Sequence, residues 1–450
     1  MDQDIAQLEQ QLNSYDPPER LSALFELADL LARGQARVSA DRGLANMHCH
    51  TFYSYNAYGH SPTALAWLAR QRGFAAIGVV DFDVLDGVDE FLFACEILGV
   101  RGSAGIETRV AVPELATQVI NSPGEPGVAY HMGIGFATGT PPASVAPILA
   151  SMRDRAAERN RAMLSKINAH LDPVTVDHEG DVLPLTPAGN ATERHMLAAI
   201  IRASQRRFPR RDRRAAFWSD RLGVEKEQVL SAMAEPVGFA DLVRSRLMKS
   251  GGVGHVPPTP DSFPSVEEFH SFVVGCGALP CVAWLDGTSE GEENGAELLE
   301  TWVGKGAVAL NLIPERNWNL PPGPDRSLKI RKLREIVQAA ADLDLPLNIG
   351  TEMNSPGAPL ADDFSAPILA PMTRAFMAGA YFIYGHTVMQ RSLALGYQSR
   401  WAQEHLPSRR RRNDFYETIG RRVRPGAEGM DRLRRLLDLS TPDAILAQLS

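Results

Sequence analysis

Two histidines alternate at the end of a short apolar run, at His48 and His50. Residues two apart on a β-strand face the same side, so both imidazoles can point at one spot. Two further apolar runs end in carboxylates, at Asp81 and Glu107. Imidazoles and carboxylates at neighbouring strand ends are the ligands that a divalent cation takes at the mouth of a barrel. The spacing therefore predicts a divalent-metal site.

Strands and helices are predicted to alternate around these residues. Ser61 and Pro62 are expected to begin a helix and Gly73 to end it, because Ser caps, Pro suits the first position and Gly stops a helix. Further strands are expected at 75–81, 127–136, 279–285, 307–313, 345–349 and 381–384, and further helices at 88–98, 153–171 and 330–340. Such alternation, repeated seven or eight times, predicts an α/β fold with a parallel sheet, which this chain length favours as a closed barrel.

The chain divides into a barrel and added helical segments. We expect a helical N-terminal extension over 1–42, a barrel domain over 43–395 with a helical insertion at about 172–262, and a basic, helical C-terminal extension over 396–450. Basic runs at 206–214 and 409–412 are interpreted as solvated faces.

Composition restricts the function classes. The 450 residues carry a formal charge of −8, which argues against nucleic acid as a partner, except for a short oligonucleotide as substrate. No apolar run approaches the ~18 residues of a membrane span, and the first residues lack a basic-then-apolar signal pattern. The four cysteines form no CxxC pair. We therefore expect a cytoplasmic protein without a membrane partner.

Several motifs together resemble the PHP (polymerase and histidinol phosphatase) superfamily. They are residues 46–51, 80–87, 105–107, 130–135 and 193–200, in the family's order. The resemblance implies a distorted (βα)7-type barrel that binds up to three divalent metals and hydrolyses phosphoesters. It implies His48, His50, Glu107 and Glu352 as ligands of a first metal, and Glu107 with His131 as ligands of a second.

Other positions depart from the family's pattern. Phe82, Trp284 and Asn354 stand where the family has histidines, and Phe and Trp cannot bind a metal. We therefore expect one or two ions instead of three, with Mn²⁺, Zn²⁺ and Fe²⁺ as candidates because the ligands mix imidazole and carboxylate. Asp81 is either a ligand or a residue that holds a ligating histidine in place.

Each candidate residue has an expected role. The metal ligands are expected to be His48, His50, Asp81, Glu107, His131 and Glu352, with Asp81, Glu107 and His131 also catalytic. The expected substrate-binding residues are Arg194, His195, Arg316 and His386, with Lys249 as a further phosphate partner.

Three functional hypotheses follow. The first is a metal-dependent phosphoesterase that hydrolyses a small phosphorylated metabolite or nucleotide through a metal-activated water. The second is a catalytically degenerate PHP-fold protein that binds a ligand or partner. The third is a hydrolase of a non-phosphate bond, since barrel metal sites host many chemistries.

Overall fold

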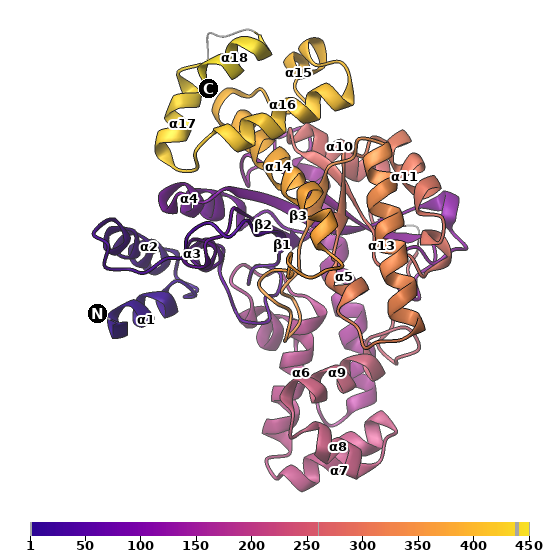
Figure 1. Ribbon diagram of the computed structural model, residues 1–450. Helices are drawn as coiled ribbons and strands as arrows, with labels where there is room; N and C mark the ends of the chain where they lie inside the picture. The colour runs from indigo at the N-terminus through magenta and orange to yellow at the C-terminus, as the bar shows by residue number, and fades with distance from the viewer. Residues whose placement is uncertain (1, 260, 437–440, 450) are drawn as a thin grey trace.

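A single seven-stranded sheet forms the centre of the protein, as a computed structural model shows (Figure 1). The structure describes residues 2–259, 261–436 and 441–449. The strands lie in chain order: β1 (Ala45–Cys49), β2 (Ala76–Phe82), β3 (Gly102–Ala111), β4 (Val128–Ile134), β5 (Leu279–Ala283), β6 (Ala309–Leu312) and β7 (Leu347–Ile349). Neighbouring strands are parallel except at β4, which runs antiparallel to both β3 and β5.

The first and last strands meet and nearly close the sheet into a barrel. Cys49 at the end of β1 bridges to Glu352, three residues beyond β7. The backbone N–H of His50 donates to the carbonyl of Glu352 at 2.7 Å, and the N–H of Glu352 donates to the carbonyl of His48 at 2.8 Å. The predicted α/β barrel is thus confirmed in outline, whereas the expected uniformly parallel sheet is wrong at β4.

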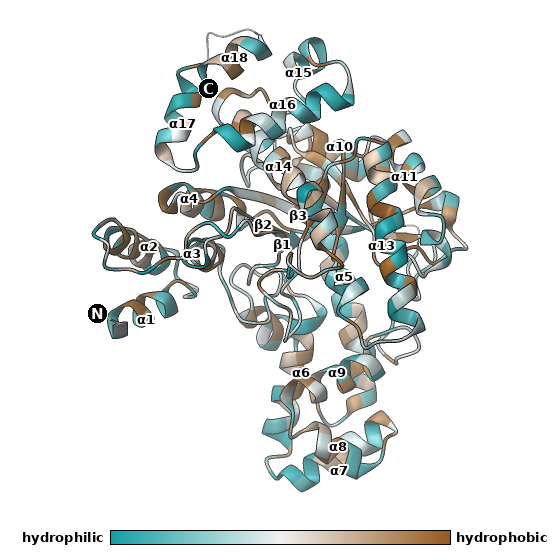
Figure 2. Cartoon of the chain, in the orientation of Figure 1, coloured by the Kyte–Doolittle hydropathy of each residue, from teal (hydrophilic) through white to brown (hydrophobic). Residues whose placement is uncertain are grey.

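Helices cover the outside of this barrel. The helix predicted after Ser61 is present as α3 (Pro62–Arg72): the Ser61 side chain accepts from the N–H of Ala64, and Gly73 ends the helix with φ 68°. Other helices around the barrel are α4 (Val88–Leu98), α10 (Val266–Gly275), α11 (Gly295–Gly304), α12 (Glu315–Trp318) and α13 (Pro324–Asp342). Figure 2 shows hydrophobic and hydrophilic residues alternating along α13, as expected of a helix with one buried face.

The strand predicted at 381–384 is wrong, because these residues lie inside helix α14 (Thr373–Leu393). A short apolar run reads the same in a buried strand and in a helix that is buried nearly all round, so periodicity could not separate the two. Helix α14 packs against β1, β2, β3 and β7.

A helical lobe projects from one side of the barrel (Figure 1). It follows α5 (Ala146–Leu171) and contains α6 (Glu193–Arg207), α7 (Arg211–Leu222), α8 (Lys226–Ala232) and α9 (Pro236–Leu247). The lobe has its own hydrophobic core, in which Ile200, Trp218 and Val243 are fully buried. Asn190, just before α6, fastens the lobe to the barrel by donating from Nδ2 to the carbonyls of Tyr53 and Phe82, at 3.1 and 2.9 Å.

Helices also pack at both ends of the chain. Helices α1 (Asp2–Gln11) and α2 (Pro17–Ala32) precede the barrel, and α15 (Arg400–His405), α16 (Arg409–Arg422), α17 (Ala427–Arg434) and α18 (Pro442–Gln448) follow it. Arg20 of α2 is 2% exposed and forms an ion pair with Glu90 of α4. Within the described part of the chain, no helix combines the length and apolarity needed to cross a membrane.

Candidate metal centre

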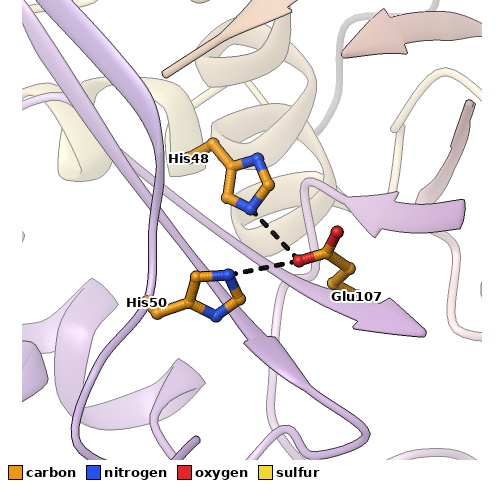
Figure 3. A group of neighbouring side chains, drawn as sticks. All are labelled: His48, His50 and Glu107. Carbon is orange, nitrogen blue, oxygen red and sulfur yellow. Dashed lines mark ion pairs between the residues drawn. The ribbon is translucent and has the colours of Figure 1, made fainter. Parts of the chain in front are cut away.

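His48, His50 and Glu107 converge at the carboxyl end of the barrel strands (Figure 3). Glu107 Oε2 lies 3.3 Å from His48 Nε2 and 3.2 Å from His50 Nε2. Strand register explains the meeting, because Glu107 pairs with Phe82 at the end of β2 and β2 in turn pairs with β1. His48, His50 and Glu107 therefore lie together, as the sequence pattern predicted.

A hydrogen-bonded chain fixes the ring of His50. His50 Nδ1 lies 3.1 Å from Ser54 Oγ, which donates to Asp81 Oδ1 at 2.6 Å. Because this hydroxyl gives its proton to a carboxylate, it accepts the proton of Nδ1, and Nε2 is the ring nitrogen that is left to face Glu107. Asp81 also accepts from the N–H and the hydroxyl of Thr51, at 2.8 and 2.7 Å. Of the two roles expected for Asp81, the geometry favours holding a histidine over binding the metal.

His48 has an equivalent arrangement on the other side. Its Nδ1 lies 3.1 Å from Asn311 Oδ1, which also accepts from Asn348 Nδ2 at 2.9 Å. An amide oxygen can only accept, so Nδ1 carries a proton and Nε2 is again the ring nitrogen that faces Glu107. Hydrogen bonds of this kind to the second ring nitrogen are typical of metal-binding histidines.

The charge state of the cluster is set by burial and by proximity. Burial opposes ionisation of Glu107, but His48 and His50 outweigh it and lower the pKa of Glu107 below its ordinary value. Burial likewise opposes protonation of His48, yet Glu107 and, at greater range, Glu352 raise the pKa of His48 above its ordinary value. The cluster therefore keeps a buried carboxylate ionised.

These atoms fit a divalent cation. Within the described residues, His48 Nε2, His50 Nε2 and Glu107 Oε2 are all buried without a hydrogen-bond partner of acceptable geometry. Buried polar atoms are normally satisfied, so three that converge on one point need an explanation. Two imidazoles and one carboxylate are a ligand set that catalytic zinc sites use, with a fourth position left for water or substrate.

Glu352 lies beside this cluster but outside it. Its side chain forms an ion pair with Arg316 of α12, with 2.7 Å between Oε2 and Nη2. Glu352 and Met353 both have positive φ, 61° and 56°, which is rare for residues other than glycine and typical of strained functional sites. The structure thus places the expected ligand Glu352 at the mouth of the barrel, bound to the expected substrate residue Arg316.

The expectation that His131 is a ligand is corrected by the register of β4. His131 pairs with Thr108 and not with Glu107, and directly opposed residues share a face of the sheet. Its ring therefore faces outward, where it lies 5.4 Å from the ring of His270 and 4.6 Å from that of Trp302. Burial, followed by His270, holds the pKa of His131 well below its usual value, as expected of a core imidazole.

The neighbouring Tyr130 takes the inward position instead. It pairs with Arg109, two residues from Glu107, and both side chains line the cavity at the barrel mouth. Burial raises the pKa of Tyr130 to about 12, so its hydroxyl stays protonated.

The expectation that His386 faces the barrel mouth is also wrong. Its Nε2 donates to the carbonyl of Gly135 at 3.0 Å, and its Nδ1 accepts from the N–H of Tyr397 at 3.0 Å. Gly135 follows β4, whose antiparallel direction carries it toward the start of β3, away from Glu107. Both ring nitrogens of His386 are thus used in joining α14 to the far end of the barrel.

His195 caps its own helix. Its Nδ1 accepts from the N–H of Thr192 at 3.1 Å, in a capping box at the start of α6. Burial lowers the pKa of His195 to about 4, so the ring is neutral. The structure gives His195 a structural partner and not a place in the cavity wall.

A cavity of about 410 Å³ opens beside Glu107 at the barrel mouth. Six cationic side chains are among those that line it: Arg109, Arg159, Arg194, Arg244, Lys249 and Arg316. The carboxylates in the wall are Asp83, Glu107, Glu125, Glu193 and Glu352. Arg194 crosses from the helical lobe to donate to Ser355 Oγ at 3.1 Å and also pairs with Asp241 at 3.0 Å. The wall thus carries both signs of charge, and several of its cations are already paired with carboxylates, such as Lys249 with Glu193 at 2.8 Å.

Two of the substituted positions are filled by aromatic rings in the cavity wall. Phe82 stacks on His50 with 4.5 Å between ring centroids and 22° between planes. Trp284 is 3% exposed. Because neither ring can bind a metal, these two positions add no ligand, and the described residues form one group of potential metal ligands around Glu107.

Sequence reasoning missed three residues of this site, namely Ser54, Asn311 and Tyr130. Asn311 is the one polar residue within the apolar run 307–313, which contains β6, and this interruption is a signal that could have identified it. Ser54 has no comparable signal, because only the turn after β1 brings its hydroxyl back to His50.

No protein-family model and no curated protein matches this chain. Among solved structures, an amidohydrolase from Chromobacterium violaceum with bound sulfate and no metal superposes with a TM-score of 0.48 and 17% identity, over 74% of this chain and 96% of its own. A protein provisionally described as a metal-dependent phosphoesterase, from Bifidobacterium adolescentis, gives 0.46 and 18% over the same shares. Similarity at this level does not identify an activity.

Proposed function

We propose that the protein is a metal-dependent phosphoesterase of the PHP type, acting on a small phosphorylated metabolite or nucleotide. One observation carries the proposal: three buried ligand atoms of His48, His50 and Glu107, none with a hydrogen bond, converge beside a cavity whose wall includes several Arg and Lys side chains. The resemblance of the ordered sequence motifs to the PHP superfamily supports it.

His48, His50 and Glu107 would hold one divalent cation. Such an ion polarises a phosphoryl oxygen and lowers the pKa of a bound water from 15.7 toward neutrality. Ser54 and Asn311 keep the two imidazoles in the tautomer that ligation requires. Among the residues that the structure describes, no second group of this kind is present, and His131 faces away from the cluster.

Cationic side chains would bind and orient the substrate. Arg194 reaches the cavity from the lobe and Arg316 from the barrel, so a phosphoryl group between them meets donors from two sides. Guanidinium groups suit this role because their N–H donors match phosphate oxygens in pairs. Glu107 reaches the same cavity.

The proposal is tested by a phosphoester screen on metal-free and metal-loaded protein. Nucleotides, sugar phosphates and short oligonucleotides are offered with Mn²⁺, Zn²⁺ or Fe²⁺, and released phosphate is measured. Hydrolysis by wild-type protein that needs the metal and is lost in His50→Ala is the expected result. Metal binding without hydrolysis of any of these esters would overturn it.

A ligand-binding protein is the second candidate. The observations that favour it are the aromatic rings of Phe82 and Trp284, at positions where the resemblance implies metal-binding histidines. In the same screen, a phosphorylated compound that binds tightly and is recovered unchanged would establish this second function.

A further inference from the structure

Arg316 and Glu352 form an ion pair in the wall of the cavity. Both side chains line the same cavity as Glu107, and Nη2 and Oε2 are 2.7 Å apart. This contact is the single hydrogen bond that the described residues give the Arg316 side chain. A guanidinium has five N–H donors, so most of its binding capacity is unused.

We propose that Arg316 is an anion-binding residue of this cavity and that Glu352 is an internal competitor, which a phosphate group must displace. The inference rests on the proposed function for the identity of the anion. A carboxylate and a phosphate present the same kind of oxygen pair to a guanidinium, so the two compete for the same donors.

The backbone of Glu352 is anchored, so only its side chain needs to move. Its N–H donates to the carbonyl of His48 at 2.8 Å and its carbonyl accepts from His50 at 2.7 Å. The next residue is held as well, because the carbonyl of Met353 accepts from the N–H of Ala57 at 2.9 Å. Rotation of the Glu352 side chain can therefore release Arg316 without opening the barrel.

The exposure of the two side chains indicates which of them an incoming anion can contact. The Arg316 side chain is 39% exposed and faces the cavity, whereas that of Glu352 is 13% exposed. An incoming anion reaches the guanidinium first. In the empty cavity Glu352 compensates the charge of Arg316, since a half-buried charge without a partner is costly.

Phosphate binding to the metal-free full chain tests the inference without requiring catalysis. Inorganic phosphate is titrated calorimetrically into wild-type protein, Glu352→Gln and Arg316→Gln. Removing the competing charge in Glu352→Gln should tighten phosphate binding about three- to fivefold, which is the range that a partly exposed ion pair contributes. Arg316→Gln should lose phosphate binding.

Glu96→Gln is the matched control. It removes the same charge from a half-buried ion pair with Arg391, which does not line the cavity, and it should leave phosphate affinity at the wild-type value. Unchanged or weaker binding by Glu352→Gln, or binding by Arg316→Gln equal to that of wild type, would overturn the inference. Because no metal and no turnover are involved, these outcomes are separate from failure of the phosphoesterase proposal.

Discussion

Ser54 Oγ lies 3.1 Å from His50 Nδ1 and links this ring to the buried carboxylate of Asp81 by hydrogen bonds. The hydroxyl donates to Asp81 and therefore accepts from the imidazole. A histidine held this way presents Nε2 to the cluster in one tautomer and one orientation.

Loss of this support should weaken metal binding without removing a ligand. Ser54→Ala leaves Asp81 one donor short and His50 free to rotate, so we expect metal affinity to fall about 10- to 100-fold. Competition with a chromophoric chelator measures it. Ser204→Ala is the control, because Ser204 is equally buried but contacts Trp218 in the lobe; an equal loss in both variants would contradict the role of Ser54.

The ligand set predicts one metal ion per chain. His50→Ala or Glu107→Gln should abolish metal retention while the far-ultraviolet circular dichroism stays that of a folded barrel. His131→Gln should retain one equivalent, because this ring faces the helices and not the cluster. Elemental analysis after gel filtration decides, and loss of the metal in His131→Gln would refute the register argument.

Arg194 should affect substrate binding and leave the metal in place. Its guanidinium lies in the cavity wall and contacts Ser355, so Arg194→Ala removes a phosphate contact made in ground and transition states alike. We expect KM for a phosphoester to rise about tenfold with kcat little changed. A fall in kcat at constant KM would instead place Arg194 in the chemical step.

Acid should destabilise the fold through its buried histidines. Burial lowers the pKa of His386 to about 4, whereas the unfolded ring titrates near 6.5. Between these values the unfolded state binds more protons than the folded state. The free energy of unfolding therefore keeps its full His386 contribution above about pH 6.5 and decreases as the pH drops toward 4. Urea denaturation at several pH values measures the slope, which should be shallower in His386→Gln; an identical slope would exclude His386 as a contributor.

The candidate site was predictable where a single strand carries the information. His48 and His50 share a face because the side-chain period of a strand is two, and Asp81 and Glu107 close apolar runs. Their meeting needed only adjacent parallel strands, which the alternation of strands and helices implies.

The predictions for His131 and His386 were wrong because strand register and long-range packing, which the local sequence does not specify, determine where these side chains point. His131 and Tyr130 are neighbours on β4, and which of them faces the cavity depends on pairing with β3 across an antiparallel contact. His386 was misplaced because the run before it fits both a strand and a buried helix. Neither ambiguity can be removed by the local pattern, since long-range packing resolves both.

The most direct test of the central claim is the rate of phosphoester hydrolysis as Mn²⁺, Zn²⁺ or Fe²⁺ is added stepwise to metal-free wild-type protein. If His48, His50 and Glu107 bind the single ion that supports catalysis, the rate rises linearly and reaches a plateau at one equivalent. A rate that is independent of metal, or that is zero at every ratio with all three ions, would contradict the account.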